Sequence, residues 1–339
     1  MDLRELTLLS GVSGNEADIR RGITRELESL GVPYELDVLG NIIARKGSKG
    51  PKVMVDAHMD EVGLIVTFIE KNGFVRFSAV GGIDPRVLVS KRVLIGKDRV
   101  PGVIGAKAIH LQEPKEREQV IPKDQLFIDI GAKSRDEAEK KVKPGDYAIF
   151  DTEYEELWPG IIKSKALDDR VGCALLLETL KEPWENIQLY AVFAVQEEVG
   201  TRGARVASYA IAPDMGIALE GTVCADIPGT DKEFQATRLG KGAVLSIMDR
   251  GSIPSRTMLK ELLRLAQENN IPVQFRETTS GGNDAAAIHL AREGCPVASI
   301  SVPCRYIHTP CSVMSMADFE AAKKLLVLFL KSVEGGFRP

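Results

Sequence analysis

The feature that most constrains the fold of this chain is an alternation of helix-like and strand-like segments after residue 168. Residues 170–180 and 202–210 have apolar side chains at helical spacing, and each segment is followed by a short apolar run, at 188–195 and 215–219. The same order continues with a helix at 258–266, a strand at 273–276, a helix at 285–292, a strand at 297–302 and a final helix capped by Ser315. Such alternation is typical of strands covered by helices. We therefore predict an α/β fold with a mixed, mainly parallel sheet sandwiched by helices.

The N-terminal segment fits the same layered domain. Ser13 and Glu16 have the spacing of a capping box, and an apolar stripe follows them up to Gly31, which predicts a helix. Strands are expected at 41–44 and 52–57, and the second of these runs directly into His58.

The pattern of apolar and polar residues changes between Val62 and Ile161. Short alternating runs are separated by Gly, Pro and Asn, and Lys71-Asn72-Gly73 lies between two of them as a hairpin signal. Only one helix is evident in this stretch, opened by Ser134. We predict a small β-barrel-like domain at 63–161, inserted into a main domain made of 1–62 and 162–339.

The overall composition excludes several classes of function. The chain has 339 residues and a formal net charge of −4, with acids and bases interleaved, so that no basic face is expected for nucleic acid or an anionic membrane. Its first residues do not resemble a secretory signal, and the apolar run at 325–330 is too short to span a bilayer. Five scattered cysteines indicate reduced thiols, and we expect a cytoplasmic protein.

Histidines and carboxylates follow the predicted strands one after another. They are His58, Asp60, Glu61, Asp168, Asp169, Glu197, Glu198, Glu220 and His308, with Arg305 nearby. Ligand sites in open α/β sheets lie at the carboxyl ends of the strands, so these side chains are expected to meet. Two imidazoles with several carboxylates suit zinc or cobalt, and they exceed what one tetrahedral ion can use. We therefore predict a site for two divalent ions.

Each of these residues also has a structural interpretation. A single histidine at a strand end can be merely hydrogen-bonded, and Asp168 or Asp284 can cap a helix. For Asp284 the cap is the favoured interpretation. Cys304, His308 and Cys311 have spacings that zinc could use, but they are too few for a closed structural site.

Five motifs in order along the whole chain resemble those of the tetrahedral aminopeptidase (TET) family of cytoplasmic di-metal aminopeptidases, which includes glutamyl and leucyl types and members labelled endoglucanase. These motifs are AHMDEVG (57–63), ALDDRVG (166–172), QEEVGTRGA (196–204), GGNDA (281–285) and RYIHTP (305–310). The resemblance implies a di-zinc exopeptidase fold. It also implies a subunit that assembles through the inserted domain, from dimers to tetrahedral dodecamers.

The resemblance implies a role for each site residue. Asp168 would bridge two ions, His58 and Glu220 would complete one ion site, and Glu198 and His308 would complete the other. Glutamate at position 220 departs from the aspartate that is usual in the family, which keeps the charge and lengthens the side chain.

The two catalytic residues implied by the resemblance are Glu197 and Asp60. Glu197 would be the general base and acid, and Asp60 would orient the His58 imidazole. Neighbouring residues on an extended segment point to opposite sides, so we expect Glu198 to face the metal while Glu197 faces the water. The peptide bond between Asp168 and Asp169 is expected to be cis.

These inferences predict a metal-dependent aminopeptidase that removes N-terminal residues from short peptides through a water activated by two ions. A deacylase or dipeptidase on the same scaffold is an alternative, motivated by Glu220. A glycoside hydrolase would need two carboxylates flanking a sugar bond and no histidines, which fits the pattern less well. A non-catalytic assembly protein would have no need for a base at Glu197.

Overall fold

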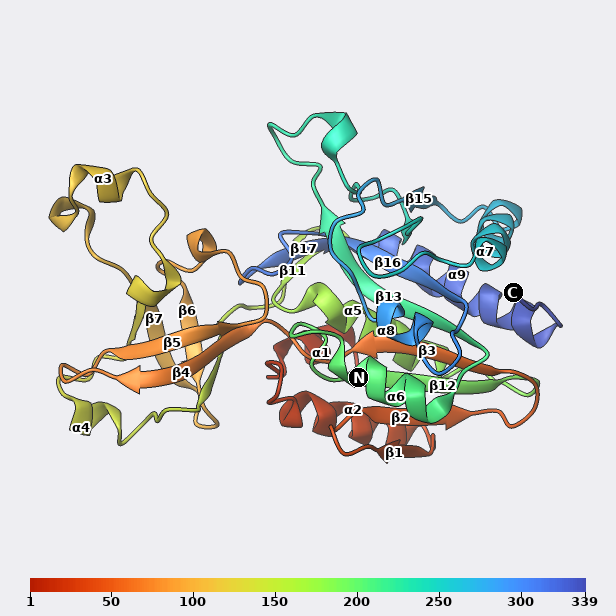
Figure 1. The fold of residues 1–339 in the computed structure, drawn as a ribbon, viewed down its shortest axis with the longest axis horizontal. Coiled ribbons are helices and arrows are strands. Elements are labelled where there is room, and N and C mark those ends of the chain that lie inside the picture. Colours follow the sequence, from red (N-terminus) through yellow and green to blue (C-terminus); the bar gives the residue numbers. More distant parts are fainter.

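The computed structural model describes residues 1–339 and contains two bodies, a large layered domain and a small barrel beside it (Figure 1). The large domain is built on an eleven-stranded mixed sheet in which four central strands run parallel, in the order β12-β3-β13-β16. Its strands are β1 (Tyr34–Leu36), β2 (Ile42–Lys46), β3 (Lys52–His58), β10 (Glu155–Trp158), β11 (Ile161–Ser164), β12 (Gln188–Ala194), β13 (Met215–Cys224), β14 (Ala243–Leu245), β15 (Val273–Phe275), β16 (Val297–Arg305) and β17 (Ser312–Ser315). The predicted mixed, mainly parallel sheet is confirmed at its centre, while the outer pairings are mostly antiparallel.

Helices cover both faces of this sheet. One face is packed by a large core that includes α1 (Leu3–Leu8), α2 (Ala17–Ser29), α5 (Leu167–Thr179), α7 (Arg256–Glu268) and α9 (Met316–Glu334). The opposite face is covered by α6 (Arg202–Ile211) and α8 (Ala285–His289), around a smaller core of mainly short aliphatic residues. The central strands are therefore apolar on both sides, which is why they read as continuous apolar runs rather than as alternating ones.

The predicted helix ends are only partly correct. Ser134 and Ser315 cap α4 (Arg135–Ala138) and α9 through their hydroxyl groups. The capping box at Ser13 and Glu16 is wrong, because α2 begins at Ala17 without a side-chain cap and the Ser13 hydroxyl donates to Asp60 instead, over 2.6 Å. The two residues have the right spacing, but a tertiary partner outcompetes the local one.

The inserted segment forms a closed six-stranded barrel, in the order β4-β5-β8-β7-β6-β9, with a core of its own. Its strands are β4 (Gly63–Ile69), β5 (Val75–Val80), β6 (Arg92–Ile95), β7 (Val100–Gly105), β8 (Phe127–Asp129) and β9 (Tyr147–Phe150). The short helices α3 (Pro114–Arg117) and α4 lie on the barrel side of the molecule (Figure 1). Strand β10, which the predicted boundary at 161 assigns to the insertion, belongs to the large sheet, where it pairs with β11.

Four single turns of 3₁₀ helix complete the structure: η1 (Pro85–Val87), η2 (Ile109–Leu111), η3 (Lys123–Gln125) and η4 (Lys232–Phe234). None of the helices is both long and apolar enough to cross a membrane.

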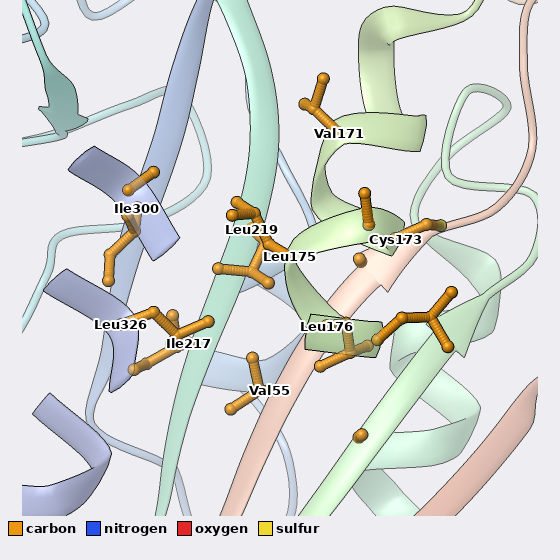
Figure 2. Packing of buried hydrophobic residues seen from close by; sticks show 14 of the residues in the cluster. Val55, Val171, Cys173, Leu175, Leu176, Ile217, Leu219, Ile300 and Leu326 are labelled. Carbon is orange, nitrogen blue, oxygen red and sulfur yellow. The ribbon is translucent and has the colours of Figure 1, made fainter. Parts of the chain in front are cut away.

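Helix α5 packs between the sheet on one side and the helices α1 and α9 on the other. Leu175 and Leu176 on α5 lie among side chains from three central strands and from α9, including Val55, Ile217, Ile300 and Leu326 (Figure 2). All of these side chains are fully buried. The packing fixes the beginning of α5, and with it the turn that contains Asp168.

Replacement of Leu176 by alanine should therefore destabilise the protein by about 2–5 kcal/mol, since a buried leucine loses its transfer free energy and leaves a cavity. Leu290 is 74% exposed and is the matched control, with an expected change within about 0.5 kcal/mol for Leu290→Ala. Denaturant unfolding of both variants measures the difference, and equal losses would contradict the packing described for α5.

Candidate metal centre

The candidate site lies where the carboxyl ends of the central parallel strands meet the loop after β11 and the loop after β16. His58 is the last residue of β3, and Glu220 lies within β13, beside Ser301 of β16. Asp168 stands at the start of α5 in non-helical backbone, and its peptide bond to Asp169 is cis, as predicted. The structure brings together the seven residues to which the family resemblance assigns a role: His58, Asp60, Asp168, Glu197, Glu198, Glu220 and His308.

Two imidazoles approach the two oxygens of Asp168 from different sides. The Nε2 atom of His58 lies 3.4 Å from Asp168 Oδ1, and the Nε2 atom of His308 lies 3.4 Å from Asp168 Oδ2. Glu220 Oε2 is 3.7 Å from His58 Nε2, whereas Glu198 Oε2 is 3.4 Å from His308 Nε2. The arrangement divides into two groups of side chains that share Asp168.

Each imidazole is held by its other nitrogen. His308 Nδ1 lies 2.9 Å from the carbonyl oxygen of Gly82, and His58 Nδ1 lies 3.2 Å from the carbonyl oxygen of Asp60. A carbonyl oxygen only accepts, so in both rings Nδ1–H donates, and Nε2 faces the carboxylates. Nε2 can hold that position either by carrying a proton itself or by offering its lone pair to a cation that lies between it and the carboxylates.

The backbone loop of Glu197 and Glu198 is organised by Asp60. Asp60 Oδ1 accepts from the Glu197 N–H over 3.0 Å, and Asp60 Oδ2 accepts from the Glu198 N–H over 3.2 Å and from the Ser13 hydroxyl. Asp60 therefore holds this loop as well as facing His58, a second function that strand patterns do not reveal. Ser13 is a supporting residue that the sequence analysis missed.

The expectation that Glu197 and Glu198 lie on an extended segment is wrong. Strand β12 ends at Ala194, Gln196 has a positive φ of 57°, and the Gly200 and Thr201 N–H groups close a turn onto the Glu197 carbonyl oxygen. The two carboxylates still separate, because the turn directs Glu198 toward His308 and leaves Glu197 Oε2 at 4.0 Å from His58 Nε2.

The site contains more carboxyl groups than imidazoles, and its burial disfavours the charged form of those carboxyl groups. Desolvation, together with nearby carboxylates, raises the pKa of Glu197 and of Glu198 to about 8, and it raises the pKa of Glu220 well above its usual range. Burial disfavours the protonated form of His308, yet hydrogen bonding to Asp168 and the charge of Glu198 raise its pKa to about 9. Without bound cations, the carboxyl groups of Glu197, Glu198 and Glu220 and the His308 imidazole therefore retain protons to a higher pH than usual.

The donor set fits divalent ions. Asp168 Oδ1 is buried and has no hydrogen-bond partner in the chain. Two triads of side chains each have carboxylate and imidazole atoms close enough together to hold one ion. The triads are His58–Asp169–Glu220 and Asp168–Glu198–His308. In the first triad Asp169 already accepts the N–H groups of His58 and Gly172, so Asp168 is the freer carboxylate beside His58.

Behind the first triad lies a buried carboxylate pair, Asp56 and Asp284. Asp56 belongs to β3, and no carboxylate oxygen of either residue has a hydrogen-bond partner. The predicted cap is wrong, because Asp284 occupies the N-cap position of α8 but its side chain caps nothing. Burial and then the charge of Asp56 raise the pKa of Asp284 well above its usual range. Asp56 was missed because it reads as one polar residue inside a buried strand.

The remaining candidates lie outside the cluster. Cys304 is buried without joining a ligand group. His289 of α8, which is not a candidate, also lies apart, with its Nδ1 facing the Cys295 carbonyl oxygen. His308 is directed at Asp168, so Cys304, His308 and Cys311 form no common ligand group, in agreement with the expectation that they are too few for a closed zinc site. Arg305 forms a two-pronged ion pair with Asp226, at 2.7 Å for each contact.

A buried ion network supports the centre from the side of the N-terminal helices. Glu61 accepts from Lys165 Nζ with both oxygens over 2.8 Å, and it also accepts from Arg170 and from the Gly11 N–H. Burial lowers the pKa of Lys165 to about 8 although Glu61 opposes this shift. The network joins the loop before α2 to both flanks of the turn that contains Asp168.

Comparison with known proteins places this site in a family context. The sequence pattern of the M42 glutamyl aminopeptidases matches residues 40–325. A putative aminopeptidase of Acetivibrio thermocellus is 41% identical over 96% of both chains, and the lysyl aminopeptidase of Pyrococcus furiosus is 34% identical over 96% of this chain and 94% of its own. The structure of the Pyrococcus horikoshii TET1 peptidase, which can assemble into a tetrahedron or a large octahedral shell, superposes with a TM-score of 0.85 at 34% identity, covering 96% of this chain and 97% of the other.

The buried ion network gives a stability prediction. Glu61→Gln leaves the Lys165 and Arg170 charges buried without their partner, which should cost about 3–5 kcal/mol in denaturant unfolding. The matched control is Glu178→Gln, because Glu178 pairs with Lys181 at the surface, and its loss should be about 1 kcal/mol or less. A loss for Glu61→Gln as small as that of the control would show that Glu61 does not neutralise this pair.

Proposed function

The chain belongs to the M42 glutamyl aminopeptidase family and is an aminopeptidase, and on that premise we propose that it uses two divalent ions to remove N-terminal residues from short peptides. The observation that carries the proposal is the sharing of Asp168 between His58 and His308 at equal distances of 3.4 Å. We infer that zinc or cobalt binds to two groups of residues. One group is His58, Asp168 and Glu220, and the other is Asp168, Glu198 and His308.

When bound by these residues, the ions would polarise the scissile carbonyl group and would make a water acidic enough to lose its proton near neutral pH. Glu197 accepts that proton at its carboxylate. Its carboxylate lies 4.0 Å from His58 Nε2 and forms no other ion pair, so it is free to accept a proton. The same carboxyl group then donates the proton to the leaving amine. Asp60 keeps Glu197 in place through the backbone bond of 3.0 Å.

Glu220 reaches the centre although glutamate is longer than the aspartate expected at this position. Its Oε2 faces His58, and its Oε1 accepts from the Asp284 N–H over 3.4 Å. The extra methylene is thus accommodated by a contact with the start of α8. This contact supports Glu220 as a metal ligand, so its identity does not favour the deacylase or dipeptidase alternative.

We also propose that the chain forms homo-oligomers, because the relative from Pyrococcus horikoshii assembles into closed shells and has the same fold along nearly its full length. The barrel is the proposed contact element. Light scattering on the purified protein tests this, and a monomer at micromolar concentration would overturn it.

Activity tests should start with aminoacyl-anilides that carry a free or an acetylated amino group. We expect cleavage of the free form only, and no release of reducing sugar from glucans. If protein loaded with Zn²⁺ or Co²⁺ hydrolysed acetylated substrates as well as free ones, the aminopeptidase assignment would give way to a deacylase.

Removal of metal should change both activity and stability. A chelator is expected to abolish hydrolysis and to lower the melting temperature, because ions that bind only the folded protein stabilise it by about 2.7 kcal/mol at a concentration one hundred times their dissociation constant. Readdition of Zn²⁺ or Co²⁺ should restore both quantities. Unchanged activity and melting temperature after metal is shown to be absent would refute the two-ion proposal.

Glu197→Gln separates the proton transfer from metal binding. The amide cannot accept a proton, so kcat should fall by about 10²–10⁴-fold, while two ions per chain remain bound as measured by elemental analysis. Glu293→Gln, at an exposed position on the loop after α8, should behave as the unmodified protein. Full activity of Glu197→Gln would remove Glu197 from the mechanism.

A further inference from the structure

The two ion groups of the candidate centre, the first around His58 and the second around His308, rest on different parts of the molecule. In the first group, His58 Nδ1 faces the Asp60 carbonyl oxygen over 3.2 Å, and Glu220 Oε1 accepts from the Asp284 N–H over 3.4 Å. These residues lie in or next to β3, β13 and α8. The contacts that hold the first group therefore come from the large domain.

The second group is in contact with a short segment of the barrel. Gly81 and Gly82 directly follow β5, and the next residue, Ile83, is buried in the barrel core. The Gly82 carbonyl oxygen accepts from His308 Nδ1 over 2.9 Å. Gly81 passes close to Glu198, since a Cβ built on this glycine would lie 3.3 Å from the Glu198 Cβ atom. The barrel segment therefore contacts both residues that belong to the second group alone.

His308 depends on such support more than the other candidate ligands do. Its side chain is 39% exposed, whereas the side chains of His58, Asp168, Glu198 and Glu220 are between 1% and 10% exposed. His308 also has left-handed backbone, with a φ of 57°, which is unfavourable for residues other than glycine and requires neighbouring contacts to maintain it. Because packing holds this ring only partly, the hydrogen bond to the Gly82 carbonyl oxygen fixes the direction in which Nε2 points.

We propose that Gly81 and Gly82 are positioning residues for the ion of the second group, so that the barrel sets the metal affinity of this group and not that of the first. This inference rests on the proposed function, because it takes both groups as ion sites. An imidazole that donates from one nitrogen to a carbonyl oxygen is fixed in orientation and is more basic at the other nitrogen. Both effects favour a metal ion at His308 Nε2.

The absence of a side chain at both positions is what allows this close approach. A Cβ built on Gly82 would lie 3.3 Å from His308 Nδ1, which is tighter than an ordinary van der Waals contact. Gly81 has a φ of 84°, and a Cβ built on it would lie 2.8 Å from Val62 Cγ1 as well as close to Glu198. A methyl group at either position should therefore displace a residue of the second group without removing any ligand.

Variants that retain one complete ion group identify which ion is affected. His58→Ala leaves the second group complete, and His308→Ala leaves the first group complete. In the His58→Ala protein, Gly82→Ala should raise the dissociation constant for Zn²⁺ by about 10–100-fold, as is typical for the loss of a residue that supports a metal ligand. In the His308→Ala protein, the same substitution should leave Zn²⁺ binding unchanged. Competition with a chromophoric chelator measures both dissociation constants.

Gly81→Ala is an independent second variant, which should weaken the binding of the same ion through Glu198. Its matched control is Gly131→Ala. Gly131 follows β8 of the barrel and has a similar φ of 78°, but a Cβ built on it would meet no atom within 4 Å. Gly131→Ala should therefore leave Zn²⁺ binding unchanged in both single-group proteins, which separates the strain of a left-handed alanine from contact with the ligands.

The results distinguish the failure of this inference from the failure of the proposed function. An equal loss of Zn²⁺ affinity in the His58→Ala and His308→Ala proteins would overturn the inference, because it would indicate a general loosening of the structure. Unchanged Zn²⁺ binding by the glycine variants in the His58→Ala protein would overturn it as well. Binding of fewer than two Zn²⁺ ions by the unmodified protein would instead overturn the proposed two-ion function. If Gly82→Ala does not fold, as judged by circular dichroism, Gly81→Ala decides.

Discussion

The crowding of carboxylates at the ends of buried strands is the constraint on which the rest of this structure depends. Like charges in a low-dielectric interior repel strongly, and the raised pKa values of Glu197, Glu198 and Glu220 express that cost. Such a cluster persists only if the surrounding fold holds it rigidly and if protons or cations compensate its charge. The parallel strands provide the rigidity, since β3 and β13 are packed on both faces by helices.

Asp60 and Glu61, which are adjacent in the sequence, each stabilise a different loop of the site. Asp60 organises the turn of Glu197 and Glu198 by accepting their backbone N–H groups, and Glu61 anchors Lys165 and Arg170 on either side of the Asp168 turn. Adjacent residues in the sequence thus support the two halves of the centre separately. The arrangement explains how loops that follow different strands can hold the candidate ligands in fixed positions.

Sequence periodicity predicted the long central strands and the longer helices of the large domain, because each of these strands is a continuous apolar run. The short strands β1, β14 and β17 were not predicted. The meeting of His58, Asp168 and His308 followed from the rule that parallel strands end at one edge. The incorrect predictions of local structure have a common cause. Ser13, Asp284 and the Glu197–Glu198 turn were assigned from local spacing, whereas tertiary partners decide their geometry.

The carbonyl group of Gly82 belongs to the segment between β5 and β6 of the barrel, yet it fixes the ring of His308 at the end of the large sheet. The two bodies of Figure 1 are therefore not interchangeable modules. A graft of the barrel from one relative onto the layered domain of another would transfer an acceptor for the imidazole together with the surface of the barrel. The inserted domain of this chain therefore contributes a hydrogen-bond acceptor to the candidate metal centre.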